Sequence, residues 1–389
     1  MNSENEGKHF DASQKSEVIK SSHNNDKRTD HDGINDYIFQ KPVRHGHKKK
    51  KMKRWKKVVL GTLISVVSLL LAAVICLLIF INVGKGQLLD GNEDGIILTP
   101  DSAKSYDNGR FVEHNGKKYE YNKNITSFLF MGIDKPELTE NEVSFGRNGD
   151  ADVLLLLTLD TQSGETNLIS ISRDTMAEMD VYSESGKYAG TKTQQICLAY
   201  AYGNGRETSC ENEVEAVRKL FYNVPINSYL ALDLSAISVL NDTVGGVTVE
   251  SLETFKKFTK GETVTLYGDD AETYVRSRNT EILDSNNTRM ERQKQYLKAF
   301  FDKVVYETKN DLMTPVDLYN QASPYMVTNI GITQVSYLSS QLLGKSFSDF
   351  NMQNVPGEVK QGENYAEYYV DEEAFYEIFL DVYYNQVVV

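Results

Sequence analysis

The longest apolar segment of this chain lies near its N-terminus and is followed by a series of much shorter apolar runs. Residues 58–83 form 26 positions without a charged side chain, which as a helix would span about 39 Å and could cross a bilayer with some tilt. Eight Lys and Arg residues lie between positions 48 and 57, and only Lys85 follows closely on the other side. Because basic flanks stay in the cytoplasm, the pattern predicts an uncleaved transmembrane anchor with the C-terminal domain outside the cell.

A buried helix of a soluble protein or a cleaved signal peptide would give a similar apolar run. The length of the run and the 57 residues that precede it favour the anchor. Nucleic acid and anionic membrane lipids are both candidate partners of the basic flank, and its place beside a membrane segment favours the lipids.

The remaining sequence divides into three further regions. Residues 1–57 are polar, so we expect a disordered cytoplasmic tail, and residues 84–110, rich in Gly, Asp and Ser, are expected to form a stalk. Order is expected to begin at Phe111, because Asn115-Gly116 between two short strand-like segments is a strong hairpin signal. Residues 111–389 are then predicted to fold as the outer domain.

Short apolar runs alternate with amphipathic segments in this outer domain. Strands are predicted at residues 127–133, 153–159 and 166–171, with a hairpin at Gly164 between the last two. Helical spacing of apolar residues is found at 214–221, at 237–244 and most strongly at 290–305. Since near-continuous apolar strands are typical of a sheet covered on both faces, the pattern predicts a layered α/β domain.

Charge is distributed as unevenly as hydrophobicity. The 389 residues carry a formal net charge of −13, yet residues 1–57 hold 15 Lys and Arg against 8 Asp and Glu. The outer domain is therefore strongly acidic, which argues against nucleic acid as its partner. An anionic ligand would need a local cluster of basic side chains.

Cys197 and Cys210 lie 13 positions apart in the outer domain. We expect a disulfide between them, worth about 3 kcal/mol, because disulfides persist outside the cytoplasm. Two buried free thiols are the alternative, since the sequence does not show whether the two Cβ atoms approach each other.

Charged residues lie at the ends of the predicted strands, where α/β folds commonly bind ligands. Asp134 follows the first strand, Asp152 precedes the second and Arg173 follows the third. Asp134 has a structural alternative, because a single Asp after a strand is usually a turn or helix-capping residue.

A second group of cationic and amide side chains lies further along the chain. It consists of Arg276, Arg278, Arg289, Arg292 and Gln293. The last three share one face of a predicted helix, whereas the two-residue spacing of the first pair requires the chain to leave helical geometry there. A surface ion pair is the alternative for Arg292, which follows Glu291.

These two groups together suit phosphoryl transfer. Guanidinium groups bind phosphate oxygens in pairs, and carboxylates can hold a Mg²⁺ ion that bridges the same phosphates. In such reactions positioning and charge stabilisation do most of the catalysis.

In the order and spacing of these motifs, the outer domain resembles the LytR-CpsA-Psr family of bacterial cell-envelope enzymes from about Ile125 to Val305. The motifs that carry the resemblance are Gly132-Ile133-Asp134, Ser170-Ile171-Ser172-Arg173-Asp174, Gln195–Gly203, Asp242–Val247, Ala271–Arg278 and Arg289–Gln293. A cytoplasmic tail, one membrane helix and an outer catalytic domain are also typical of the family.

The resemblance implies a mixed β-sheet fold and a phosphotransferase in the bacterial cell membrane. Its substrate would be an anionic glycopolymer, of teichoic acid or capsular polysaccharide type, moved from a polyprenyl-diphosphate carrier to peptidoglycan. An apolar groove between sheet and helices would take the prenyl tail.

Roles for individual residues follow from the same resemblance. Asp134 and Asp152 would place Mg²⁺. The diphosphate would be held by Arg173, Arg276, Arg278 and Gln293. Arg289 and Arg292 are further substrate-binding candidates.

One departure concerns the family's R-S-D-T motif, which reads Asp150-Ala151-Asp152-Val153 here. Asp150 in place of Arg removes a phosphate ligand and adds a negative charge, and Arg147 is the candidate to supply the missing guanidinium. The family's K-I-N segment also lacks its Lys, although Lys192 lies nearby.

Two functions therefore remain open. The first is a Mg²⁺-dependent glycopolymer–peptidoglycan phosphotransferase, with pyrophosphatase activity on the carrier as a variant of the same chemistry. The second is a non-catalytic or weakly active module that binds lipid diphosphate and regulates or scaffolds envelope assembly, which the altered motifs favour.

Overall fold

The computed structural model describes residues 68, 72, 75, 76, 78–89, 96–134, 149–277, 285–343, 345, 349–363 and 365–387. The chain divides into two compact units, residues 1–62 and 63–389, and every described residue belongs to the second. The predicted tail, residues 1–57, and most of the predicted anchor, residues 58–83, lie outside the described residues. Residues 78–89 are helical, and within the described ranges no helix combines the length and apolar character needed to cross a bilayer.

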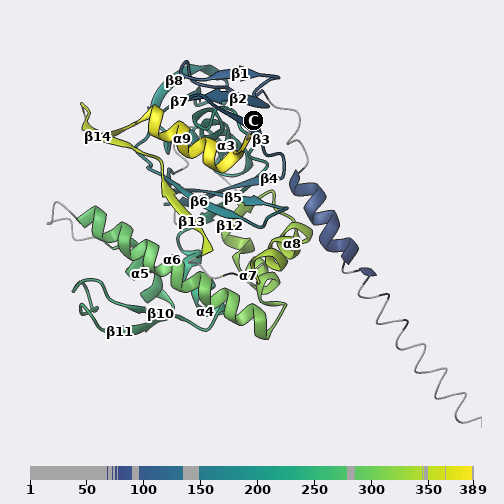
Figure 1. The fold of residues 1–389 in the computed structure, drawn as a ribbon. Coiled ribbons are helices and arrows are strands. Elements are labelled where there is room, and N and C mark those ends of the chain that lie inside the picture. Colours follow the sequence, from purple (N-terminus) through teal and green to yellow (C-terminus); the bar gives the residue numbers. More distant parts are fainter. Residues whose placement is uncertain are drawn as a thin grey trace, which may run out of the picture. The chain divides into compact units, whose positions relative to one another are not determined.

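A mixed β-sheet organises the second unit (Figure 1). Its strand order in the described residues is β12-β9-β4-β5-β6-β13, with β4 parallel to β9 and antiparallel to β5. The strands are β4 Ile125–Ile133, β5 Ala151–Asp160, β6 Thr166–Ile171, β9 Ser228–Asp233, β12 Met326–Thr328 and β13 Asn351–Asn354. The three predicted apolar strands are therefore β4, β5 and β6, and the last two pair as an antiparallel hairpin around Gly164, as predicted.

Alternate side chains of the central strands face two separate cores. On one face, Leu129 and Met131 belong to the same buried cluster as residues of α3 (Glu207–Leu220) and α9 (Glu372–Tyr383). On the other face, Phe128 joins Leu88 and Tyr337, the latter on α8 (Ile332–Leu342). Each fully buried Leu or Phe adds about 1.5–3 kcal/mol to the free energy of unfolding. Burial on both faces explains why the strands are almost continuously apolar.

A third buried cluster forms around a small two-stranded sheet, and includes Val244, Leu266, Tyr274 and Tyr296. Its elements are α4 Ala236–Thr243, β10 Val247–Glu250, β11 Thr263–Leu266, α5 Asp269–Arg276 and α6 Ser285–Asn310. Helices α4 and α6 confirm the periodicities predicted at 237–244 and 290–305. The chain continues through α7 (Thr314–Ala322) and a 3₁₀ turn, η1 (Ser323–Tyr325).

The predicted hairpin at Asn115-Gly116 is present as β2 (Phe111–His114) and β3 (Lys117–Tyr121). Both turn residues have positive φ, 50° and 73°, as a two-residue type I′ turn requires. Strands β1 (Lys104–Tyr106) and β16 (Tyr384–Val387) complete this sheet. Part of the segment expected as a stalk is therefore folded.

Two further hairpins lie outside the central sheet. They are β7 (Met176–Tyr182) with β8 (Tyr188–Gln195), and β14 (Gly357–Gln361) with β15 (Ala366–Val370). A parallel bridge pairs Thr175, just before β7, with Tyr368 in the middle of β15.

The expectation of a disulfide is wrong, because Cys197 and Cys210 are free thiols buried in the core. Cys197 immediately precedes the short helix α2 (Leu198–Ala201), and Cys210 lies within α3. Burial raises the pKa of Cys197 to about 12 and also raises that of Cys210. Both sulfurs therefore stay protonated and act as small apolar side chains.

Candidate active site at the sheet edge

Four strand ends meet at one edge of the central sheet. Ile133 at the end of β4 lies beside Asp233 at the end of β9 and opposite Ala151 at the start of β5. Ile171 at the end of β6 lies opposite Leu154 near the same end of β5. We call this edge, with Asp134, Asp150, Asp152, Arg173, Asp174, Glu272 and Arg276, the arginine edge.

Arg173 lies among three carboxylates at this edge. Its Nη1 donates to Asp152 Oδ1, its Nη2 is 3.3 Å from Asp150 Oδ2 and its Nε is 3.7 Å from Asp174 Oδ1. About a third of the Arg173 side chain, 34%, is exposed, so the guanidinium is held by its partners yet open to solvent. The structure thus brings together Arg173 and Asp152, two residues that the sequence singled out.

Asp174 is a site residue that the sequence reasoning did not select. Its Oδ1 accepts a hydrogen bond of 3.0 Å from Gln195 Nε2, which is also 2.8 Å from the Ala366 carbonyl oxygen. Burial raises the pKa of Asp174, and the positive charge of Arg173 opposes this rise. Its place directly after Arg173 at a strand end was the available signal.

Arg276 is the last residue of α5 and connects this helix to the sheet. Its Nη1 lies 2.6 Å from Glu272 Oε1, one turn earlier, and its Nη2 donates to Asp134 Oδ1. Glu272 was also missed, although a Glu four residues before an Arg is a recognisable helical ion pair. Ser277 has an extended backbone, so the helix ends where the spacing of the two Arg residues required. Arg278 lies outside the described residues, and so does Arg147.

Arg292 is buried, with 1% of its side chain exposed, and does not form the surface ion pair that was its alternative. Its two terminal nitrogens donate to the backbone carbonyls of Tyr274 and Ser277. Its Nε lies 2.9 Å from Glu253 Oε1, and its guanidinium carbon lies 4.0 Å from the centre of the Phe255 ring. Burial lowers the pKa of Arg292, and Glu253 opposes this effect.

Gln293 is the next residue of α6, and its Nε2 donates a hydrogen bond of 3.3 Å to the Val275 carbonyl oxygen. The last carbonyls of a helix lack partners within the helix, so α6 satisfies those at the end of α5. Arg292 and Gln293 therefore hold the helix end that carries Arg276. Arg289, on the same helix, is half-buried, and its charge contributes to lowering the pKa of Arg292.

Glu213 is a buried carboxyl group that interacts electrostatically with Asp150 of the arginine edge. Glu213 of α3 is fully buried, and its Oε2 accepts a hydrogen bond of 2.9 Å from the Tyr200 backbone nitrogen. Burial raises the pKa of Glu213 well above its ordinary value, the Tyr200 hydrogen bond opposes this, and the charge of Asp150 adds to the rise. The buried environment therefore favours the neutral, protonated form of the Glu213 side chain.

The carboxylates of the edge fit a magnesium ion only in part. In the described portion of the chain, no group of three or more His, Cys, Asp or Glu side chains is arranged to hold a metal. Asp134 and Asp152 each bind a guanidinium instead. Mg²⁺ commonly takes one or two protein carboxylates and completes its shell with water and phosphate oxygens, so each of these carboxylates has the chemistry of a magnesium ligand.

The chain is similar in sequence to known transferases. The chain is 31% identical over 219 residues to the polyisoprenyl-teichoic acid–peptidoglycan teichoic acid transferase TagV of Bacillus subtilis, a match covering 54% of this chain and 50% of TagV. It is 26% identical over 252 residues to the corresponding transferase TagU of Enterococcus faecalis, covering 63% of this chain and 76% of TagU. The chain thus spans about half the length of TagV and three quarters of that TagU.

Solved structures share the fold. The crystal structure of Bacillus subtilis TagV matches with a TM-score of 0.51 and 24% identity, covering 66% of this chain and 96% of that one. Protein gbs0355 of Streptococcus agalactiae matches with a TM-score of 0.54 and 19% identity, covering 67% and 86%. The LytR_cpsA_psr family model matches residues 98–380, a range that includes the central sheet, the arginine edge and most of α9. This protein therefore belongs to the LytR_cpsA_psr family.

Proposed function

We propose that this protein is a phosphotransferase that moves an anionic glycopolymer from a polyprenyl-diphosphate carrier to peptidoglycan. The names of its relatives TagV and TagU support this reaction class. For this chain, the proposal rests on one observation: Arg173 and Arg276 are both held by carboxylates at the arginine edge.

The two guanidinium groups suit a diphosphate because they are fixed and partly exposed. Their charges are balanced by Asp134, Asp150 and Asp152 when no phosphate is present. A diphosphate carries charge of the same sign and can replace these carboxylates without moving the Arg side chains far. Ion pairs of this kind keep the site ordered before substrate binds.

An apolar surface leads away from the arginine edge along one sheet face. Phe130, Leu155 and Leu230 are register partners on neighbouring strands and are half-buried. Phe128 and Leu159, further from the edge on the same face, are fully covered. A prenyl chain could lie on this partly open surface, since burial of each CH₂ group contributes about 0.8 kcal/mol.

Magnesium is part of the proposal. Asp134 and Asp152 would hold the ion. When bound, Mg²⁺ would neutralise charge on the phosphate oxygens.

In the proposed reaction, a hydroxyl oxygen of the acceptor sugar forms a bond to the phosphorus next to the donor glycan. The bond between that phosphorus and the bridging oxygen breaks, and polyprenyl phosphate leaves. The hydroxyl proton passes to a carboxylate of the arginine edge. Arg173 and Arg276 stabilise the charge on the phosphate oxygens during transfer.

The proposal places the folded unit outside the bacterial membrane. Residues 58–83 would anchor the chain, and the basic flank before them would stay with anionic lipids in the cytoplasm. An anchored site would meet a lipid-linked donor directly.

Asp150 favours a second candidate function, a module that binds lipid diphosphate without turnover. Its carboxylate lies 3.3 Å from Arg173 Nη2 and competes with phosphate for that nitrogen. In this case the native chain would retain lipid diphosphate and release nothing, and Asp150→Arg would gain the activity that the native chain lacks.

The test uses the full chain in detergent with a polyprenyl-diphosphate-linked glycan, Mg²⁺ and peptidoglycan. We expect release of polyprenyl phosphate and attachment of glycan to peptidoglycan, both lost in Arg173→Ala. Arg110→Ala is the matched control, because Arg110 is exposed on the β1–β2 turn and pairs with Glu120 away from the site. Bound donor without turnover would support the second candidate, and turnover unchanged in Arg173→Ala would reject both.

A further inference from the structure

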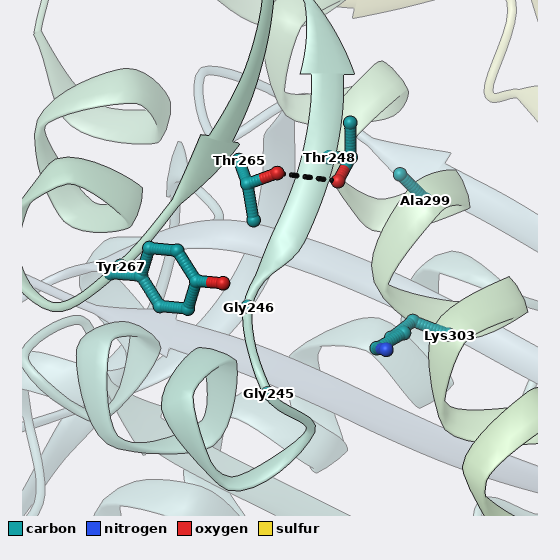
Figure 2. Close-up of a pocket in the computed structure, with 7 residues that line it drawn as sticks. All are labelled: Gly245, Gly246, Thr248, Thr265, Tyr267, Ala299 and Lys303. Atoms are coloured by element: carbon teal, nitrogen blue, oxygen red, sulfur yellow. Dashed lines mark hydrogen bonds between the residues drawn. The ribbon is translucent and has the colours of Figure 1, made fainter.

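An open cavity of about 480 Å³ lies at the small two-stranded sheet. Figure 2 shows its lining, which comes from the turn between α4 and β10, from β10 and β11, and from α6. The lining residues are Gly245, Gly246, Thr248, Thr265, Tyr267, Ala299 and Lys303. We call it the hairpin pocket; its volume lies within the usual range of small-ligand sites.

Tyr267 provides an exposed aromatic ring that is already positioned. The residue is 57% exposed, and in Figure 2 its hydroxyl points toward the backbone at Gly246. The ring lies against Gly246, where an added Cβ would be 2.6 Å from Tyr267 Cε1. Gly246 also has a φ of +87°, which favours glycine. A ring held in this way loses little side-chain entropy when a ligand packs on it.

Hydroxyl groups form the neighbouring wall. Thr248 and Thr265 are register partners on the exposed face of β10 and β11, and their Oγ1 atoms lie 2.9 Å apart. Each hydroxyl has one donor and two acceptor positions, so the pair can still bind further hydroxyl groups of a ligand. An aromatic face beside hydroxyls is suited to a sugar, which has an apolar C–H face and polar edges.

The charge of the pocket does not suit a diphosphate. Its cation, Lys303, lies 2.8 Å from the carboxylate of Glu307, which balances its charge. None of the lining residues is Arg, the side chain that binds phosphate oxygens in pairs. The chemistry of the lining therefore favours a neutral or singly charged saccharide.

The pocket and the arginine edge lie at opposite ends of one helix. Tyr267 precedes α5 by two residues, and Arg276 ends it. Helix α5, with eight residues, is about 12 Å long, a length that a polymeric glycan spans with a few sugar units.

We propose that the hairpin pocket is a saccharide-binding subsite that holds a glycan chain whose reacting end lies at the arginine edge. This inference rests on the proposed function for the identity of the glycan, but the pocket's binding of sugar can be measured without turnover.

The first experiment measures binding of a soluble N-acetylglucosamine tetramer to the full chain in detergent by calorimetry. Tyr267→Ala should raise the Kd about tenfold, and Tyr106→Ala, which removes a ring of similar exposure (52%) on β1, should leave it unchanged. Gly246→Ala should also weaken binding because its Cβ displaces the Tyr267 ring. Equal affinity in Tyr267→Ala and the native chain, or no binding at millimolar sugar, would overturn the proposal.

A second experiment separates the two sources of the glycan and the two proposals. With long-chain substrates, a raised KM of Tyr267→Ala for the lipid-linked donor assigns the pocket to the donor glycan, and a raised KM for peptidoglycan assigns it to the acceptor. An unchanged KM for both would contradict the role in transfer. Arg173→Ala should abolish turnover yet bind the tetramer normally, so failure of the proposed function and failure of the subsite give different results.

Discussion

The guanidinium of Arg276 pairs with the carboxylate of Asp134, so the last residue of α5 is tied to the residue that follows β4. Arg292 and Gln293 of α6 donate hydrogen bonds to backbone carbonyls at the same helix end. The position of Arg276 at the arginine edge therefore depends on three separate elements, and its partners can be tested one at a time.

Arg276→Lys should reduce turnover at least tenfold while the melting temperature stays nearly constant. Lys is a point charge and cannot contact Asp134, Glu272 and a phosphate with a planar fork. The ion pairs of Arg276 are partly exposed, so their loss costs little stability. Polyprenyl phosphate release and thermal unfolding would be measured on the same sample; a large fall in melting temperature would show that the residue is mainly structural.

Asp150→Asn should tighten binding of a lipid diphosphate several-fold. The substitution keeps the side-chain shape but removes the negative charge that lies 3.3 Å from Arg173 Nη2. Affinity for a short-chain prenyl diphosphate would be measured in Mg²⁺ at two salt concentrations, because the effect is electrostatic and should shrink at high salt. Glu178→Gln, an exposed change on β7, is the control. Equal affinities at low salt would argue that Asp150 does not compete with phosphate.

Arg292→Met should lower the free energy of unfolding by about 2–4 kcal/mol, since it removes a buried cation, leaves the carbonyls of Tyr274 and Ser277 without a donor and leaves Glu253 without its ion-pair partner. Arg206→Met, at a side chain that is 39% exposed, should change it by less than about 0.5 kcal/mol. Denaturant unfolding gives both values. Comparable losses in the two variants would contradict the structural role of Arg292.

Glu213→Gln should stabilise the fold increasingly as pH rises above the ordinary carboxyl pKa of 4.5. Burial raises the pKa of Glu213 above its ordinary value of 4.5, so the native state retains a proton that the unfolded chain releases. The native chain therefore loses stability as pH rises above 4.5 toward the raised pKa, and the neutral Gln has no such loss. Melting temperatures of the two proteins should diverge with pH. A difference that is constant across this range would mean that Glu213 does not titrate as proposed.

The elements that depend on local pattern could be predicted from the amino-acid sequence. The apolar runs of β4, β5 and β6, the turn at Asn115-Gly116 and the periodicity of α4 and α6 are all visible there, because strand burial and helix amphipathicity repeat over a few residues. Motif order also pointed to the family and to Asp134, Asp152, Arg173 and Arg276.

Which of these side chains touch depends on how distant parts of the chain pack together. The pairing of Arg276 with Asp134 joins residues 142 positions apart, and the hydrogen bonds of Arg292 to the carbonyls of α5 have no counterpart in local spacing. For the same reason Cys197 and Cys210 could not be resolved from their spacing, since a disulfide depends on the approach of two Cβ atoms across the fold. Contacts between distant elements follow from how helices and sheet pack, and that packing is set by the whole core rather than by any one segment.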